Sequence, residues 1–197
     1  MVPPALLTKA WMAGDGSLFA ALPHLTWALY GGGREGFANN AVRLHVPLHL
    51  LKDAPVAATV TVGKTCERAT LRADLKEGDA YVGDRYYGES YAFFGQLHEK
   101  GCRYLIRLIE KTVVTTVVEE LSISAEDTAA GVIRQAMVRL GSERTRSEVL
   151  RVIWFTGTGG QLIMLATNLS ADELSAADAT RFYKHRWQIE YLLPAFV

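Results

Sequence analysis

The sequence predicts a mixed α/β domain built around a central sheet. Runs of β-branched and alternating apolar residues recur along the chain, and segments with the apolar spacing of helices separate them. The length agrees with this class, because 197 residues that are 49% hydrophobic and 21% charged can form one domain with a substantial core. We therefore expect a single domain over residues 1–197.

The first half predicts strands before helices. An apolar segment over residues 11–19 is interrupted by the sequence GDGS at residues 14–17. The runs AVRLHVPLHLL and PVAATVTVG favour two strands, and residues 53–55 supply the turn of a hairpin between them. The spacing of Leu71 and Leu75 then predicts a helix that ends near Gly78.

The second half alternates strand and helix and ends in a long helix. We expect a strand in AYVGD, an amphipathic helix over residues 90–100 closed by Gly101, and a strand in CRYLIRLI. Residues 111–165 are β-rich and include the hairpin VLRVIWFT-GTGG-QLIMLATNL. Asp172 or Ser175 caps the final helix, which runs to about Leu193.

Composition excludes some classes of protein and leaves others open. No run approaches the ~18 apolar residues of a membrane span, and the start lacks the order of a signal peptide, so we expect a cytoplasmic protein without a membrane partner. The formal net charge is +0, so any DNA-binding basic surface must be local. Cys66 and Cys102 are far apart, and we expect both to be buried free thiols.

The final helix carries an unusual combination of side chains. Tyr183, Arg186 and Glu190 follow the spacing Y-x-x-R-x-x-x-E, and steps of three and four residues return to one face of a helix. An aromatic hydroxyl, a guanidinium and a carboxylate on one face are an odd set to leave in water, while Phe182 is expected to face the core.

Three acidic residues are candidates for a metal site. Asp15 lies in the first strand region, Asp84 ends the AYVGD strand, where open α/β sheets place ligands, and Glu190 lies on the last helix. Converging carboxylates bind the divalent cations that cleave phosphodiesters. Taken singly, Asp15 beside glycine is equally typical of a turn, and Glu190 has Arg186 four residues away as an ion-pair partner.

The motifs together resemble a known family. The segments GDGSLF, YVGDRYYGES, LATNLSADELSAAD and FYKHRWQIE occur in the order found in bacterial insertion-sequence transposases of the IS-four group. This resemblance implies a DDE enzyme whose ribonuclease-H-like catalytic domain has a mixed central sheet flanked by helices. It also implies that residues 111–165 are a β-rich insertion before the last helix.

The resemblance also implies roles for individual residues. Asp15, Asp84 and Glu190 become the catalytic acids and the ligands of Mg²⁺, with Mn²⁺ as a substitute, and Tyr183 and Arg186 contact DNA phosphate near the cut. The implied activity is cleavage and transfer of DNA strands during transposition. The implied partners are double-stranded DNA, at the element ends and the target, and further copies of the intact chain in a homo-oligomer.

Two departures from the family pattern leave the activity open. The family has a lysine seven residues after the glutamate, where this chain has Val197, and Pro194 is expected to end the helix. Family members also carry chain before the first acid and beyond the last helix, so we expect a copy truncated at both ends. The alternatives are therefore an active catalytic domain, an inactive remnant, and a DNA-binding or inhibitory partner of an intact copy.

Overall fold

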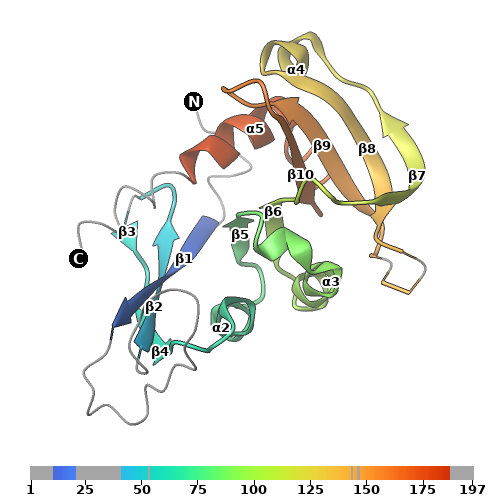
Figure 1. The fold of residues 1–197 in the computed structure, drawn as a ribbon. Helices are drawn as coiled ribbons and strands as arrows, with labels where there is room; N and C mark the ends of the chain where they lie inside the picture. Colours follow the sequence, from blue (N-terminus) through green and yellow to red (C-terminus); the bar gives the residue numbers. More distant parts are fainter. Residues whose placement is uncertain (1–10, 21–40, 53, 143, 146, 187–197) are drawn as a thin grey trace.

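The computed structural model confirms the mixed α/β class. Within the described residues, ten strands form one mixed sheet in the order β3-β2-β1-β5-β6-β10-β9-β8-β7, and β4 also pairs with β2 (Figure 1). The described residues are 11–20, 41–52, 54–142, 144–145 and 147–186.

Most predicted strands and helices are present with small shifts of their ends. The strands are β1 (Trp11–Ala20), β2 (Ala41–His49), β3 (Ala54–Pro55), β4 (Thr59–Val62), β5 (Ala80–Gly83), β6 (Arg103–Arg107), β7 (Val114–Leu121), β8 (Val132–Leu140), β9 (Leu150–Thr156) and β10 (Leu162–Thr167). The helices are α2 (Glu67–Asp74), the 3-10 turn η2 (Tyr87–Glu89), α3 (Tyr91–Glu99), α4 (Ala125–Ala129) and α5 (Ala176–His185).

Three parallel strands occupy the centre of the sheet. β1 pairs in parallel with β5, and β5 pairs in parallel with β6. On their outer sides, β1 pairs antiparallel with β2 and β6 pairs antiparallel with β10. α3 makes the crossover between β5 and β6, as parallel neighbours require. Among the described strands, only β1, β5 and β6 are parallel to one another, so their carboxyl ends lie on the same side of the sheet.

Successive residues of the central strands enter two different cores. Trp11 and Ala13 belong to the core that contains α5, whereas Met12 belongs to the core that contains α2 and α3. This is the alternation expected of a strand that is covered on both faces. In Figure 1, α5 accordingly lies on the opposite side of the strands from α2 and α3.

Aromatic packing holds α5 against β1. The rings of Trp11 and Phe182 meet edge to face with their centroids 4.9 Å apart, and both side chains are buried. Such pairs add about 0.5–1.5 kcal/mol to the stabilisation from burial alone. The start of α5 is set by Ser175, whose hydroxyl accepts a hydrogen bond from the N–H of Asp178 at 3.1 Å, so Ser175 rather than Asp172 is the cap.

The β-rich segment continues the central sheet. β10 pairs with β6, and β9, β8 and β7 follow outward, so the strands of residues 111–165 share the sheet with the parallel centre. The sequence analysis missed α4 and β8 within this segment. α4 has only five residues, and its capping box uses Asp127 in place of the usual glutamate or glutamine. In β8, the polar residues Arg134 and Gln135 are adjacent, and Gln135 is buried. They interrupt the alternation of apolar and polar residues by which a strand is recognised in the sequence.

One local prediction in the first half was confirmed and another was wrong. β1 runs through the GDGS sequence and pairs with β2 from Met12 to Ala20, so Asp15 lies in the first strand, as expected. Ala54 and Pro55 form the short strand β3 instead of a turn, with Pro55 opposite Leu48. Proline has no backbone N–H to donate. An edge strand tolerates it because backbone groups on the side away from the sheet have no neighbouring strand to bond.

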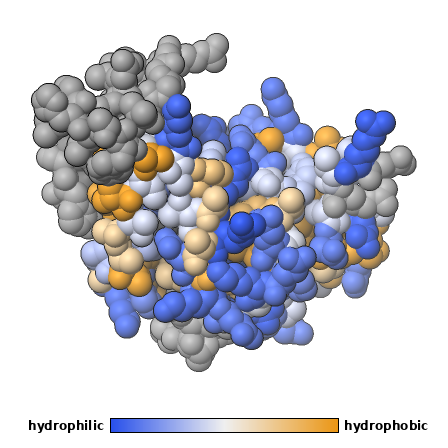
Figure 2. Space-filling model, turned by 90° about the horizontal axis from the view of Figure 1, so that it is seen from below, coloured by the Kyte–Doolittle hydropathy of each residue, from blue (hydrophilic) through white to orange (hydrophobic). Residues whose placement is uncertain are grey.

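The surface matches the balanced composition. Figure 2 shows a face on which hydrophilic residues dominate and apolar residues are scattered among them. Several large apolar side chains of the described residues are nevertheless exposed, mainly on β-strands and the loops beside them. They are Val56, Val60, Val113, Val117, Val118, Ile123, Ile133 and Leu162.

The close approach of Gly88 to β6 gives a test of the fold. A Cβ at Gly88 would fall inside van der Waals contact with the backbone carbonyl oxygen of Arg107. We expect Gly88→Ala to destabilise the protein by about 2 kcal/mol, the usual scale of overpacking.

Gly95→Ala in α3 is the control, because a Cβ there meets nothing within 4 Å. It should stabilise by about 0.5–1 kcal/mol. Urea denaturation measures both, and equal effects of the two substitutions would contradict this packing.

Candidate functional site

The register of the parallel strands aligns three polar residues. Trp11 lies opposite Ala80 and Ala13 opposite Val82, so the same offset continued by two residues aligns position 15 with position 84. In the next pair Gly83 lies opposite Ile106, so Asp84 aligns with Arg107. The observed pairs end at Ala13 and Val82 between β1 and β5 and at Gly83 and Ile106 between β5 and β6, and Asp84 is the first residue after β5. Extending the two registers beyond these pairs aligns the backbone positions of Asp15, Asp84 and Arg107 in one row.

The paired residues next to this row lie on the face of the sheet that α5 covers. Ala13, Val82 and Leu105 occupy the row two residues earlier, and all three lie in the core that contains α5. Residues two apart in a strand share a face, so Arg107 of β6 belongs to the same face as Leu105. Open α/β sheets bind ligands beyond the carboxyl ends of their parallel strands. The sheet thus brings two acidic positions and one basic position to the place where a ligand is expected.

Asp84 is half-buried at the start of a tight turn. Its Oδ1 accepts a hydrogen bond of 2.9 Å from the N–H of Tyr86, which is the geometry of an Asx turn. Buried Tyr87 and Gly88 continue this turn against the sheet. Within the described part of the chain Asp84 enters no ion pair. The turn fixes the backbone of Asp84 and engages one of its two carboxylate oxygens.

Sequence reasoning did not single out Arg107 as a site residue. The side chain is half-buried at the last position of β6, and it pairs with no acidic residue among those described. The sequence contains a usable signal, because Arg107 ends the strand that follows the Asp84 strand. Its alignment with Asp84 depends on the register of two strands, which the sequence does not state.

Tyr183 and Arg186 of α5 are both buried. Tyr183 is only 1% exposed and Arg186 only 7%. They are neighbours, as their spacing predicts, with Cζ of Arg186 5.6 Å from the centre of the Tyr183 ring. Tyr183 and Phe182 both enter the core, because α5 lies flat against the sheet. Within the described residues the Tyr183 hydroxyl is buried without a hydrogen-bond partner.

Part of the predicted site lies outside the described residues. Glu190, Pro194 and Val197 belong to this part, and so does the end of the predicted helix. The backbone of Asp15 lies in β1 opposite Val46 of β2. Among the described residues no three His, Cys, Asp or Glu side chains group closely enough to hold a metal ion.

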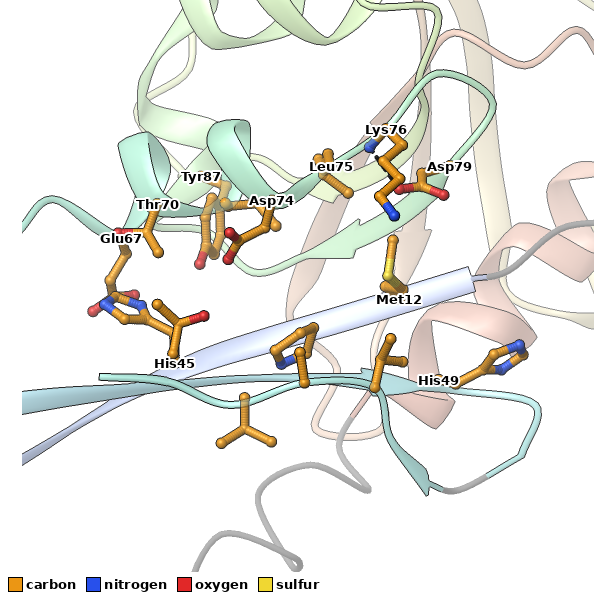
Figure 3. Close-up of a pocket in the computed structure, with 16 residues that line it drawn as sticks. Met12, His45, His49, Glu67, Thr70, Asp74, Leu75, Lys76, Asp79 and Tyr87 are labelled. Atoms are coloured by element: carbon orange, nitrogen blue, oxygen red, sulfur yellow. Dashed lines mark hydrogen bonds between the residues drawn. The ribbon is translucent and has the colours of Figure 1, made fainter. Parts of the chain in front are cut away.

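A cavity of about 420 Å³ lies on the other side of the sheet. Figure 3 shows side chains of α2 and β2 facing each other across it, with Met12 and Tyr87 among its lining. His45 in its wall is within 2.9 Å of the Thr61 hydroxyl, and burial, followed by the charge of Arg43, lowers the pKa of this imidazole. Because this wall contains residues of the α2 and α3 core, the cavity is separate from the row on the α5 face.

The two cysteines differ in exposure, contrary to expectation. Cys102 is buried, but Cys66 is exposed at the start of α2, with its sulfur 3.9 Å from the Tyr86 hydroxyl. A hydrogen bond from the Ala69 backbone is the main cause that lowers the pKa of the Cys66 thiol. Burial raises the pKa of Cys102. The expectation that both would be buried rested on the general tendency of free cysteines, whereas the exposure of Cys66 depends on where α2 begins.

Comparison with protein families places the chain in one of them. Residues 12–193 match the family described as "Transposase DDE domain". No relative was found among curated proteins. The chain is similar in structure to the piggyBac transposase in a cryo-EM synaptic complex with hairpin DNA, with a TM-score of 0.53 and 7% sequence identity. This match covers 95% of the present chain and 40% of that transposase. The likeness confirms the predicted ribonuclease-H-like fold.

No helix among the described residues is long and apolar enough to cross a membrane.

The difference between the cysteines predicts their reactivity. At neutral pH we expect iodoacetamide to modify Cys66 at least about tenfold faster than Cys102, because a lowered pKa increases the thiolate fraction and exposure admits the reagent. Peptide mass spectrometry over time measures both rates in one sample. Unfolding in urea is the control and should bring the rates together. Equal rates in the native protein would contradict the placement of Cys66.

Proposed function

Because the chain belongs to the transposase DDE domain family, we propose that it carries out metal-dependent cleavage and transfer of DNA strands during transposition. The observation that supports this reaction is the parallel pairing of β1 with β5, whose register, continued by two residues, aligns Asp15 with Asp84. We assign the chain to the IS-four group of insertion sequences. Residues 1–197 form one catalytic domain in this proposal, and residues 111–165 are its β-rich insertion.

The proposed metal ligands are carboxylates. Asp15 and Asp84 fit this role because their positions align on neighbouring strands, and Glu190 is the proposed third ligand. Oxygen ligands of this kind suit Mg²⁺, with Mn²⁺ as a substitute. When bound, the metal supplies a deprotonated nucleophile and stabilises the leaving oxygen of the phosphodiester.

The basic residues around the row have a complementary role. Arg107 aligns with Asp84, and a guanidinium there offers two parallel hydrogen bonds to a phosphate. Tyr183 and Arg186 approach from α5, so their hydroxyl and guanidinium are the proposed contacts to phosphate near the cut. Both are buried, and electrostatic attraction is stronger where water is excluded.

The proposed substrate is double-stranded DNA, at the element ends and at the target. Because the formal net charge is +0, the basic residues that contact the DNA must be concentrated at the site. In the intact enzyme we propose a homo-oligomer that brings the element ends together.

The proposal predicts metal-dependent nicking. We expect the chain to nick DNA that carries the element end in Mg²⁺ or Mn²⁺, and EDTA to abolish the cut. Asp84→Asn should lower the rate at least about 100-fold, the scale of losing one group that stabilises transition-state charge. Asp74→Asn is the matched control, because Asp74 is an exposed aspartate at the end of α2, and it should leave the rate unchanged. Nicking that survives Asp84→Asn would refute the proposed site. Binding of end DNA without any nicking would favour the inactive remnant.

Arg107 predicts a separate effect on binding. We expect Arg107→Gln to weaken DNA binding about five- to tenfold and to reduce the slope of log affinity against log salt by about one, as for one lost phosphate contact. Arg103→Gln is the control on the same strand, because Arg103 lies at the other end of β6 and pairs with Glu173 at 3.3 Å. Fluorescence anisotropy at several salt concentrations measures both variants. If Arg107→Gln and Arg103→Gln show the same dependence of affinity on salt, Arg107 does not contact a DNA phosphate.

A further inference from the structure

A single buried carboxylate caps both α4 and α5. Asp127 is 6% exposed, and its Oδ2 accepts hydrogen bonds of 2.9 Å from the N–H and from the hydroxyl of Ser124 at the start of α4. Its Oδ1 accepts a hydrogen bond of 2.7 Å from the N–H of Ala177 in the first turn of α5. The first N–H groups of a helix have no partner within the helix, so this carboxylate satisfies one that α5 cannot satisfy itself. Asp127 thereby ties the β-rich segment to the start of α5.

A buried arginine holds the same helix start from the carbonyl side. Arg151 of β9 is 1% exposed, and its Nη1 donates to the carbonyl of Leu174 at 2.6 Å and to that of Ser170 at 3.1 Å. Its Nε donates to Oε1 of Gln135 in β8 at 3.1 Å, and Gln135 in turn donates to the carbonyl of Ser122. The chain leading into α5 is therefore fixed by side chains of two neighbouring strands.

The two charges compensate each other in the interior. Burial lowers the pKa of Arg151 to about 10, and the charge of Asp127 acts in the opposite direction. Burial would raise the pKa of Asp127, but the hydrogen bonds from Ser124 and Ala177 and the charge of Arg151 outweigh it and lower the pKa. Removing one member leaves the other as a buried charge without compensation, which is more costly than never having the pair.

The opposite end of α5 carries the residues of the proposed site. Phe182 packs on Trp11, and Tyr183 and Arg186 follow it. A helix of this length transmits a shift at its start along its axis, because its hydrogen-bonded backbone is stiff. A surface ion pair of 2.7 Å between Arg181 and Glu126 joins α4 to α5 between these ends. The position of the helix is thus set jointly by polar contacts at its start and apolar contacts near its end.

We propose that Asp127 and Arg151 are positioning residues, which fix α5 so that Tyr183 and Arg186 face the row of Asp15, Asp84 and Arg107. The catalytic part of this inference rests on the proposed function. Asp127 and Arg151 touch no substrate and act through α5. The β-rich segment then has a role in the reaction, since it holds the helix that completes the site.

Substitutions of Asp127 and Ser124 separate this role from general stability. Asp127→Ala removes the carboxylate contacts to the starts of both helices and leaves the Ser175 cap of α5 in place, whereas Ser124→Ala weakens the cap of α4 and leaves the contact with Ala177. In the free protein, we expect Asp127→Ala to speed hydrogen exchange in the first turn of α5 about tenfold, the scale of one lost buried hydrogen bond, and Ser124→Ala to leave it unchanged. Asp127→Asn keeps an acceptor oxygen for Ala177 and should restore most of the protection.

Nicking kinetics test the catalytic part. We expect Asp127→Ala to lower kcat about tenfold or more and to change KM for DNA by less than about twofold, because the substrate contacts remain while their alignment is lost. Ser124→Ala should keep the wild-type kcat, and Asp127→Asn should recover much of the loss. If Asp127→Ala does not fold, Gln135→Leu replaces it, since this substitution removes the side-chain acceptor of Arg151 and leaves both caps intact.

The outcomes distinguish this inference from the proposed function. Equal exchange in α5 for Asp127→Ala and Ser124→Ala overturns the inference, and so does a wild-type kcat in a folded Asp127→Ala variant. If the wild-type chain does not nick DNA, the proposed function fails. The exchange contrast then still decides whether Asp127 holds α5.

Discussion

The parallel pairing of β1, β5 and β6 determines which residues meet at the carboxyl edge of the sheet. A parallel ladder gives each residue a fixed neighbour, and the register that pairs Trp11 with Ala80, continued past the end of the ladder at Ala13 and Val82, aligns Asp15 with Asp84. The same rule in the next pair adds Arg107. A slip of one residue would move a whole strand's side chains to the other face and exchange its two cores. The buried alternation of these strands therefore protects the alignment on which the candidate site depends.

The two faces of the sheet serve different purposes. Towards α2 and α3, aromatic side chains such as Phe94 and Tyr104 stack at 5.3 Å and form a dense support for the turn that carries Asp84. Towards α5, the core contains small residues such as Ala13, Ala80 and Ala179 beside the ring pair of Trp11 and Phe182. The cavity lies on the supporting side, and the row of acidic and basic positions lies on the other.

The β-rich segment is joined to the rest of the domain by more than strand pairing. At the end of β10, Asn168 accepts a hydrogen bond from the N–H of Tyr104 at 3.1 Å and donates one to the carbonyl of Cys102 at 2.9 Å. These contacts satisfy backbone groups at the start of β6, where the ladder ends. Together with the buried charges around the start of α5, they explain why the chain between β10 and α5 is rich in small polar residues. The LATNLSADELSAAD segment therefore has a structural role.

The sequence by itself determined the features that depend on neighbouring residues. It predicted the strand before Asp84, the helix closed by Gly101, the hairpin of β9 and β10, and the cap of α5 at Ser175 as one of two candidates. Only the tertiary structure decided the features that depend on distant partners. These are the alignment of Arg107 with Asp84, the burial of Tyr183, the exposure of Cys66 and the sharing of Asp127 between two helices. Local propensity acts over a few residues, whereas strand register and burial are set by segments far apart in the chain, because each is a property of two surfaces in contact.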